Sequence, residues 1–223
     1  MTFAVPPTRG EAVTRQLRAE IISGVLRPGE IIKDAEVAAR LNLSITPVRE
    51  AIAQLVTEGL IEVSPNRTRR VAAVTRQGAV DLIDVLGVLS CAALERAVGR
   101  LTPDDLAAMR RALTRMLADL EREDAPAAIE AGIELVRVFL VAAGNRELET
   151  LWNLTMARVQ RLMLLTAHSG LWDMWRTGLV ELLDLLERGA ADEALARYRR
   201  VFAEVDRALR DERLEDLIFD QVT

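Results

Sequence analysis

The spacing of apolar residues changes at Gly59, and this change restricts the folds open to the chain. Before Gly59, apolar residues recur every three to four positions, as on one face of an α-helix. Between residues 60 and 74, two short runs rich in β-branched residues replace that pattern, which is typical of short strands. From Thr75 onward only helical spacing remains. The patterns predict a mainly α chain with one small β-hairpin.

Three helices are predicted before the hairpin, over residues 10–23, 34–42 and 46–59. Asp34 is expected to cap the second helix and Thr46 the third. Short polar side chains at these positions accept hydrogen bonds from the unpaired N–H groups of a first helical turn.

The predicted hairpin has a basic turn. Its strands would be residues 60–63 and 69–74, and Arg67, Arg69 and Arg70 cluster around the turn with no acidic residue between them. A basic hairpin tip suits contact with the DNA backbone or minor groove. The alternative is an ordinary solvated charged loop.

The rest of the chain is predicted to be helical. Thr102 followed by Pro103 and two aspartates is a strong helix start. We expect an N-terminal winged helix-turn-helix domain over residues 1–75 and an all-α helical bundle over 76–223. The bundle helices are predicted at residues 76–100, 103–122, 126–142, 146–168, 171–188 and 190–212.

Charge is unevenly distributed. The net charge is −5, but residues 1–75 carry 10 basic and 8 acidic side chains, and the remaining 148 residues carry 19 and 26. A weakly basic front suits a protein whose front alone meets phosphate, although chance variation explains such an asymmetry as well.

The remaining composition favours an intracellular protein. With one cysteine, Cys91, no internal disulfide can form, and we interpret Cys91 as a core residue. The single histidine, His168, argues against a multi-histidine metal site and is interpreted as a helix C-terminal partner. From the sequence we expect that no apolar run reaches the roughly 18–20 residues of a membrane span, and the first residues lack the apolar core of a signal peptide. A cytoplasmic location without membrane contact is expected.

The predicted third helix has the character of a DNA-recognition helix. Ser44, Thr46 and Arg49 place small polar and basic groups at its N-terminal end, where such groups reach base edges and phosphates. Pro47 fits the first turn, where its missing N–H costs nothing. An ordinary amphipathic helix with a good cap is the alternative.

Residues 10–74 resemble the DNA-binding domain of the GntR family of bacterial regulators. The matching strings are ISG (22–24), LRPGE (26–30), EVAARL (36–41), TPVREAI (46–52) and LVTEGLI (55–61). The helical remainder, with VAAGN (141–145), resembles the ligand domain of the FadR-type (FCD) subfamily.

The resemblance implies operator contacts and a wing contact. The predicted DNA-binding residues are Lys33, Ser44, Thr46, Pro47, Arg49, Arg67, Arg69 and Arg70. Many relatives carry arginine where Ile45 stands, and often glycine where Asn66 and Thr68 stand. Losing that arginine removes a possible guanine contact worth about 1–3 kcal/mol, so the usual operator is not assumed.

The resemblance also points to an effector pocket that departs from the subfamily pattern. Metal-binding members use one aspartate and three histidines, but an ungapped placement puts Gly132, Val136, Leu179 and Val201 there, with Leu86 at a ligand-binding arginine position. We therefore expect no metal or cofactor, and a small apolar or amphipathic effector such as an acyl-like molecule or a carboxylate. The predicted pocket residues are Leu86, Val136, Arg158, Leu179 and Val201.

Two alternatives for the bundle stay open from the residues. The bundle could be collapsed and bind nothing, or one of the three arginines Arg137, Arg158 and Arg161 could meet an effector's carboxylate, although such arginines are usually at the surface. The tryptophans at 152, 172 and 175 are interpreted as packing or interface anchors.

The favoured function is a homodimeric, ligand-responsive regulator on a near-palindromic operator. The set of reactive side chains disfavours an enzyme, since Glu130 and Glu134 are better explained as exposed helix charges than as an acid–base pair. A nucleoid-type DNA-binding protein whose helical domain binds no effector is the remaining alternative.

Overall fold

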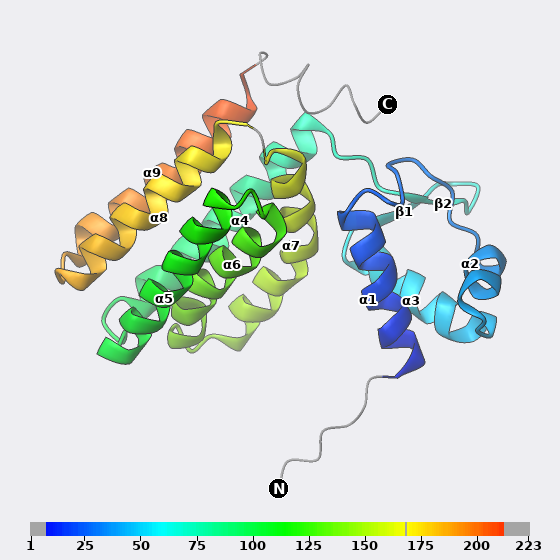
Figure 1. Cartoon of the computed structure of the whole chain (residues 1–223), viewed down its shortest axis with the longest axis horizontal. Coiled ribbons are helices and arrows are strands. Elements are labelled where there is room, and N and C mark those ends of the chain that lie inside the picture. Colours follow the sequence, from blue (N-terminus) through cyan, green and yellow to red (C-terminus); the bar gives the residue numbers. More distant parts are fainter. Residues whose placement is uncertain (1–7, 168, 212–223) are drawn as a thin grey trace, which may run out of the picture. The chain divides into compact units, whose positions relative to one another are not determined.

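The computed structural model describes residues 8–167 and 169–211, coloured along the chain in Figure 1. The chain divides into two compact units between Val74 and Thr75. The fold class is confirmed: helices dominate, and a two-stranded antiparallel sheet follows the third helix. The interpretation of His168 lies outside the described residues.

The N-terminal unit is built around one apolar core between three helices and a hairpin. Its elements are α1 (Arg9–Ile22), α2 (Asp34–Leu41), α3 (Ile45–Thr57), β1 (Ile61–Val63) and β2 (Arg69–Val71). Helix α3 lies at the centre, because α1, α2 and β1 all contact it. The fully buried core side chains come from α1, α3 and the hairpin: Val13, Leu17, Ile21, Val48, Ile52, Leu55, Leu60, Ile61 and Val71.

The hairpin is anchored on both edges of β2. Strand β1 pairs with β2 in the register Ile61 opposite Val71. On the other edge, the Gly29 N–H donates to the Val71 carbonyl at 2.8 Å, and the Ile32 N–H donates to the Arg69 carbonyl at 2.9 Å. The segment before α2 therefore supports the wing, although both strands are shorter than predicted.

Two of the predicted helix caps are wrong. Lys33 is the N-cap of α2 and Ser44 is the N-cap of α3, and neither cap has a side-chain hydrogen bond. Asp34 is instead the first helical residue of α2, and its carboxylate accepts from arginines of α3 and β2. The predicted helix end at Gly59 is confirmed, since its φ of 70° is the left-handed conformation that glycine adopts readily.

The second unit is a helical bundle with α4 inside it. Its helices are α4 (Arg76–Ala97), α5 (Pro103–Glu121), α6 (Ala125–Ala142), α7 (Arg146–Leu165), α8 (Leu171–Glu187) and α9 (Ala191–Leu209). Helix α4 contacts α6, α7 and α9, while α5 contacts α6 and α8 (Figure 1). The predicted start at Thr102 is confirmed by a capping box with Asp105.

The expectation that no segment could span a membrane needs correction for α4. By length and composition alone, this helix is long and apolar enough to cross a bilayer. Half of its apolar stretch is nevertheless buried inside the protein, against α6, α7 and α9. Such burial is typical of the core helix of a bundle, which passes the same test.

Candidate DNA-binding surface and effector cavity

The N-terminal end of α3 presents polar groups to solvent on a fixed support. Ser44 and Thr46 are exposed, and Pro47, in the first turn as predicted, is half-buried. The opposite face of α3 is fully buried through Val48 and Ile52. Because no side chain caps α3, the N–H groups of its first turn are available to an anion such as a phosphate.

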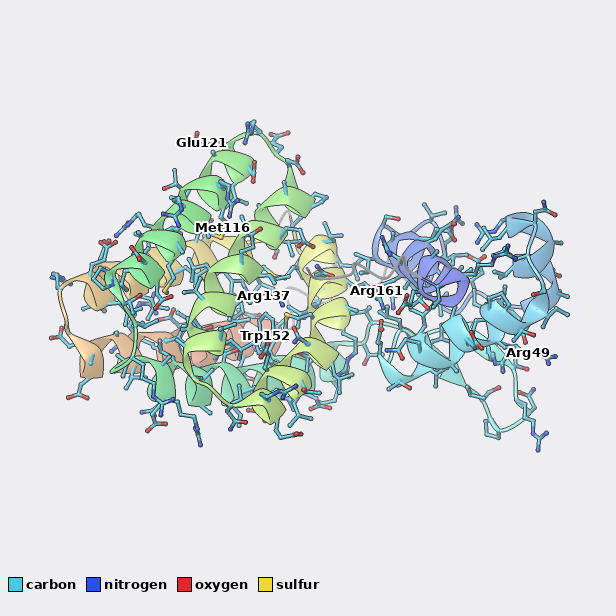
Figure 2. All side chains as sticks on the ribbon, turned by 90° about the horizontal axis from the view of Figure 1, so that it is seen from below. Arg49, Met116, Glu121, Arg137, Trp152 and Arg161 are labelled. Atoms are coloured by element: carbon cyan, nitrogen blue, oxygen red, sulfur yellow. The ribbon has the colours of Figure 1, made fainter. Side chains whose placement is uncertain are left out.

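Arg49 extends from this end of α3 and is held by Asp34. Its side chain is 66% exposed, and its Nε donates to Oδ2 of Asp34 at 3.0 Å. Figure 2 shows Arg49 at the surface of the N-terminal unit. The other carboxylate oxygen of Asp34 accepts from Arg69 of β2. Burial opposes the charge on Asp34, but the hydrogen bonds from Arg69 and Arg49 outweigh it and lower the pKa of this carboxyl.

The other predicted DNA-binding residues differ in accessibility. Arg67 is exposed at the turn of the hairpin, with a φ of 62°. Arg69 and Arg70 are half-buried on opposite faces of β2, and Arg70 donates to the Gly29 carbonyl at 3.3 Å. The exposed Lys33 pairs with Glu36 at 2.7 Å. The three arginines are therefore not one cluster: only Arg67 stands at the tip.

A bidentate ion pair fixes α1 against the end of α3. Arg18 donates through Nε (2.8 Å) and a terminal nitrogen (2.5 Å) to the two carboxylate oxygens of Glu58. Gln54 also donates to Glu58, which is only 8% exposed. Burial opposes the charge, but these hydrogen bonds lower the pKa of Glu58 overall.

The bundle encloses an apolar cavity. Its volume is about 60 Å³, taken as the space open to the centre of a water molecule. The predicted pocket residues Leu86, Val136 and Leu179 line it, as does Gly132. Polar metal ligands are thus replaced by an apolar wall at these positions.

Two predicted pocket residues lie elsewhere. Val201 is fully buried but packs on Gly178 of α8, where an added Cβ would overlap with its Cγ2 atom. Arg158 is exposed on α7 and does not line the cavity. Close packing of α8 on α9 buries the Val201 side chain away from the cavity lining, and the phase of α7 turns Arg158 outward. A role of either residue in effector binding stays a prediction.

Sequence reasoning missed the polar residues of the cavity wall. Ser90 of α4 is buried, and its Oγ accepts from Nε1 of Trp152 at 3.0 Å. The Tyr198 hydroxyl also hydrogen-bonds with the Ser90 side chain. Burial raises the pKa of Tyr198 far above its ordinary value, so its phenol is neutral. The signal in the sequence was a single serine in an otherwise apolar stretch of helix.

The other candidate arginines also lie outside the cavity lining. Arg137 is exposed on α6, with its guanidinium carbon 5.9 Å from the ring centroid of Trp152, a cation–π distance; Figure 2 labels both residues. Arg161 is buried on α7, and this burial lowers its pKa. Neither side chain places a charge on the cavity wall.

Other residues considered as chemical groups have structural surroundings. Glu130 and Glu134 are exposed and pair with Gln160 and Arg115, as expected of helix surface charges. Cys91 is half-buried rather than core, and burial raises the pKa of its thiol to about 11, which makes it a poor nucleophile.

The fold combines a winged helix-turn-helix unit, an architecture typical of DNA-binding proteins, with a helical bundle that contains an apolar cavity. Residues 9–71 match the family of bacterial regulatory proteins called the gntR family, and residues 81–215 match the FCD domain. The chain therefore belongs to the GntR family, in its FCD-containing branch.

Curated relatives and solved structures agree with this family. The chain is similar to the transcriptional regulator McbR of Escherichia coli, with 31% identity over 60% of this chain and 59% of that protein. It is also similar to the E. coli repressor RspR, with 27% identity over 51% of this chain and 50% of that protein. The matches thus span about half of these relatives' length.

Two solved structures share the fold across both units. The E. coli McbR/YncC structure has a TM-score of 0.72 at 21% identity and covers 98% of this chain and 100% of that chain. A GntR regulator from Rhodococcus sp. RHA1 has a TM-score of 0.74 at 21% identity and covers 91% and 98%. At these identities the likeness shows the fold alone.

Proposed function

We propose that this protein is a transcriptional regulator that binds near-palindromic double-stranded operator DNA as a homodimer. The observation that carries the proposal is the exposed N-terminal end of α3, where Ser44, Thr46 and Arg49 project from a helix whose other face is fully buried. A two-fold dimer presents two such helices to two half-sites one helical turn apart.

Each predicted DNA-binding residue has a role on this surface. In this proposal Arg49 reads a base edge, while Ser44 and Thr46 contact phosphates or base edges from the same end of α3. Lys33 and Arg67, both exposed, contribute charge toward the backbone. Pro47 shapes the first turn of α3. Arg69 and Arg70 act through the position of the wing, because both are bonded within the unit.

The proposed effector binds in the cavity of the helical unit and changes operator occupancy. Support comes from the cavity's apolar wall, which includes Leu86, Val136 and Leu179 and, among the described residues, carries no charged side chain. An apolar or amphipathic small molecule fits this wall, and none of the described residues that line it is a histidine, cysteine, aspartate or glutamate. Binding biases the relative placement of two recognition helices in the dimer. The proposed role is regulatory rather than enzymatic, and its site of action is the cytoplasm.

Selection of bound DNA from a random pool tests the proposal. We expect a near-palindromic consensus, and Arg49→Ala should weaken binding to it by about tenfold to a hundredfold, as for loss of one base contact. Arg15→Ala is the matched control, since Arg15 is an exposed arginine of α1 with no predicted DNA role. Unchanged affinity in Arg49→Ala would refute that residue's assignment. Binding without sequence preference would favour the nucleoid-type alternative.

A further inference from the structure

The aromatic residues of this chain gather around the bundle cavity. The sequence has eight aromatic residues, namely three tryptophans, one tyrosine and four phenylalanines. All three tryptophans, the tyrosine and one phenylalanine line the cavity: Trp152, Trp172, Trp175, Tyr198 and Phe202.

These rings form walls at regular helical spacing. On α7 the cavity is lined by Trp152 and by Met156, one turn further along. On the α8 and α9 side, Trp175 and Phe202 make an edge-to-face pair with centroids 5.1 Å apart, and Tyr198 and Phe202 make another at 5.2 Å. Because these paired rings belong to the cavity lining, a further flat ring in the cavity can make the same kind of edge-to-face or offset contact with them.

The size of the cavity restricts the length of its ligand. At about 60 Å³ it holds roughly four to six waters at 10–15 Å³ each, which favours a short, compact ligand over a long acyl chain. Three methionines on the wall, Met116, Met156 and Met163, can change rotamer and enlarge the space at low energetic cost. A molecule of one ring is therefore the appropriate size.

The wall also restricts the charge of the ligand. Among the residues that the structure describes, no acidic or basic side chain lines the cavity, and the phenol of Tyr198 is neutral. A carboxylate buried here would lack a cation, which is costly in an apolar interior. The polar groups of the lining are already bonded within the protein: the indole N–H groups of Trp152 and Trp172 donate to Ser90 and to the Met163 carbonyl, and the Tyr198 hydroxyl bonds with Ser90. A ligand with several hydrogen-bonding groups would therefore leave most of them without partners.

We propose that the cavity binds a neutral single-ring aromatic molecule carrying at most one hydrogen-bonding group. This inference rests on the proposed function only for its regulatory consequence, because binding itself needs no DNA. The proposed function allowed any apolar or amphipathic effector, including acyl chains and carboxylates. The present inference restricts the effector to a flat single ring without charge.

Titration of the full-length protein with four small molecules tests the proposal. The probe is p-cresol, compared with methylcyclohexanol (same size, no π-system), p-toluate (same ring, charged) and octanoate (acyl chain). Isothermal calorimetry gives the affinities, and tryptophan fluorescence gives the location because every tryptophan lines the cavity. We expect p-cresol to bind with a fluorescence change, and the three comparison molecules to bind at least about tenfold more weakly, a difference of roughly 1.4 kcal/mol.

Cavity-filling variants identify the site. Gly132→Leu places a side chain in the cavity beside the flexible Met116, and Val136→Phe fills it from the same helix. Both should weaken p-cresol binding by about tenfold or more. Gly99→Leu is the matched control, since a Cβ there meets nothing within 4 Å and Gly99 lies outside the cavity. Melting curves show that each variant is folded.

The outcomes separate the two proposals. Tighter binding of p-toluate or octanoate than of p-cresol, or no binding of p-cresol to the wild-type protein, would overturn the aromatic ligand. Binding of p-cresol that both filling variants leave unchanged would overturn the site. Failure to bind any operator would instead contradict the proposed function, while p-cresol binding and its loss in Gly132→Leu would still support the cavity inference.

Discussion

Asp34 binds two arginines that belong to different elements of the N-terminal unit, Arg49 of α3 and Arg69 of β2. One carboxylate thereby fixes the direction of the proposed base-reading arginine and the position of the wing. A long side chain held in one geometry before binding loses less entropy when it meets DNA. The contact is therefore a candidate source of sequence discrimination as well as of local stability.

Replacing Asp34 by asparagine should reduce discrimination between operator and unrelated DNA. Arg49 loses its charged partner and becomes less ordered, while the added positive charge strengthens non-specific binding. We expect the ratio of the two affinities to fall by about tenfold, within the range of a single base contact. Electrophoretic mobility shifts on the selected operator and on a scrambled duplex measure both affinities. Glu50→Gln is the control, with the same change of charge on exposed α3 surface; an equal fall there would contradict the role of Asp34.

The Arg18–Glu58 pair predicts a dependence of stability on pH. The pKa of Glu58 is lowered in the folded protein, so its stabilisation is complete above the ordinary value near 4.5 and is lost as the pH falls through the folded value. Glu58→Gln should lower the unfolding free energy of the N-terminal unit by about 1–3 kcal/mol at neutral pH, because a largely buried pair is broken. The difference from wild type should shrink in acid.

Circular dichroism melts between neutral pH and about pH 3 measure this difference. Glu36→Gln breaks the exposed Lys33–Glu36 pair and should cost less than about 1 kcal/mol at any pH. A constant difference between Glu58→Gln and wild type across this range would show that the charge of Glu58 is not what stabilises the unit.

At the scale of elements, the tip of the wing carries one residue in a strained backbone conformation, and this residue is also proposed to contact DNA. Arg67 has a positive φ of 62°, a conformation that costs most side chains energy and that glycine adopts freely. Arg67→Gly should therefore keep or raise the stability of the unit. It should also weaken DNA binding and reduce the slope of log affinity against log salt concentration by about one. Arg67→Lys should retain most of the slope. Fluorescence anisotropy over a salt series provides the measurement, and an unchanged slope in Arg67→Gly would exclude the wing tip from the DNA interface.

Two glycines of the bundle should respond differently to the same substitution. A Cβ at Gly178 would overlap Val201, so Gly178→Ala forces α8 and α9 apart and should cost about 1–3 kcal/mol. A Cβ at Gly132 would lie 3.3 Å from the flexible Met116 sulfur, so Gly132→Ala should be neutral or stabilising through helix propensity. Urea denaturation followed by tryptophan fluorescence compares them, and equal effects would contradict the close α8–α9 contact.

Element type was predictable because it depends on local periodicity, and so was a helix start whose partners are close in sequence. The capping box at Thr102 uses residues three apart and was found from the sequence. Asp34 was misassigned because its partners lie 15 and 35 residues away along the chain. Nor could the sequence show that Val201 packs on Gly178, because that contact depends on the packing of α8 on α9.

For the whole molecule, the sequence indicated the class of protein but not the character of its cavity. The winged helix-turn-helix followed from the order of elements and from matching motifs. The tryptophans were interpreted as packing anchors, and only the structure brings Trp152, Trp172 and Trp175 to the same cavity. Those residues are separated by a helix break, so no spacing rule could show that they face one another.

The division into two compact units predicts two separable unfolding transitions, which the aromatic residues can distinguish. Residues 8–74 contain no tryptophan or tyrosine, so tryptophan fluorescence reports the helical unit alone, whereas circular dichroism reports both. We expect Glu58→Gln to shift only the dichroism melt, and p-cresol to shift the fluorescence melt. At about 100 times its dissociation constant, a ligand stabilises the unit that binds it by roughly 2.7 kcal/mol. If Glu58→Gln shifts the fluorescence melt as far as the dichroism melt, the two units unfold together. If p-cresol shifts only the dichroism melt, the ligand binds outside the bundle.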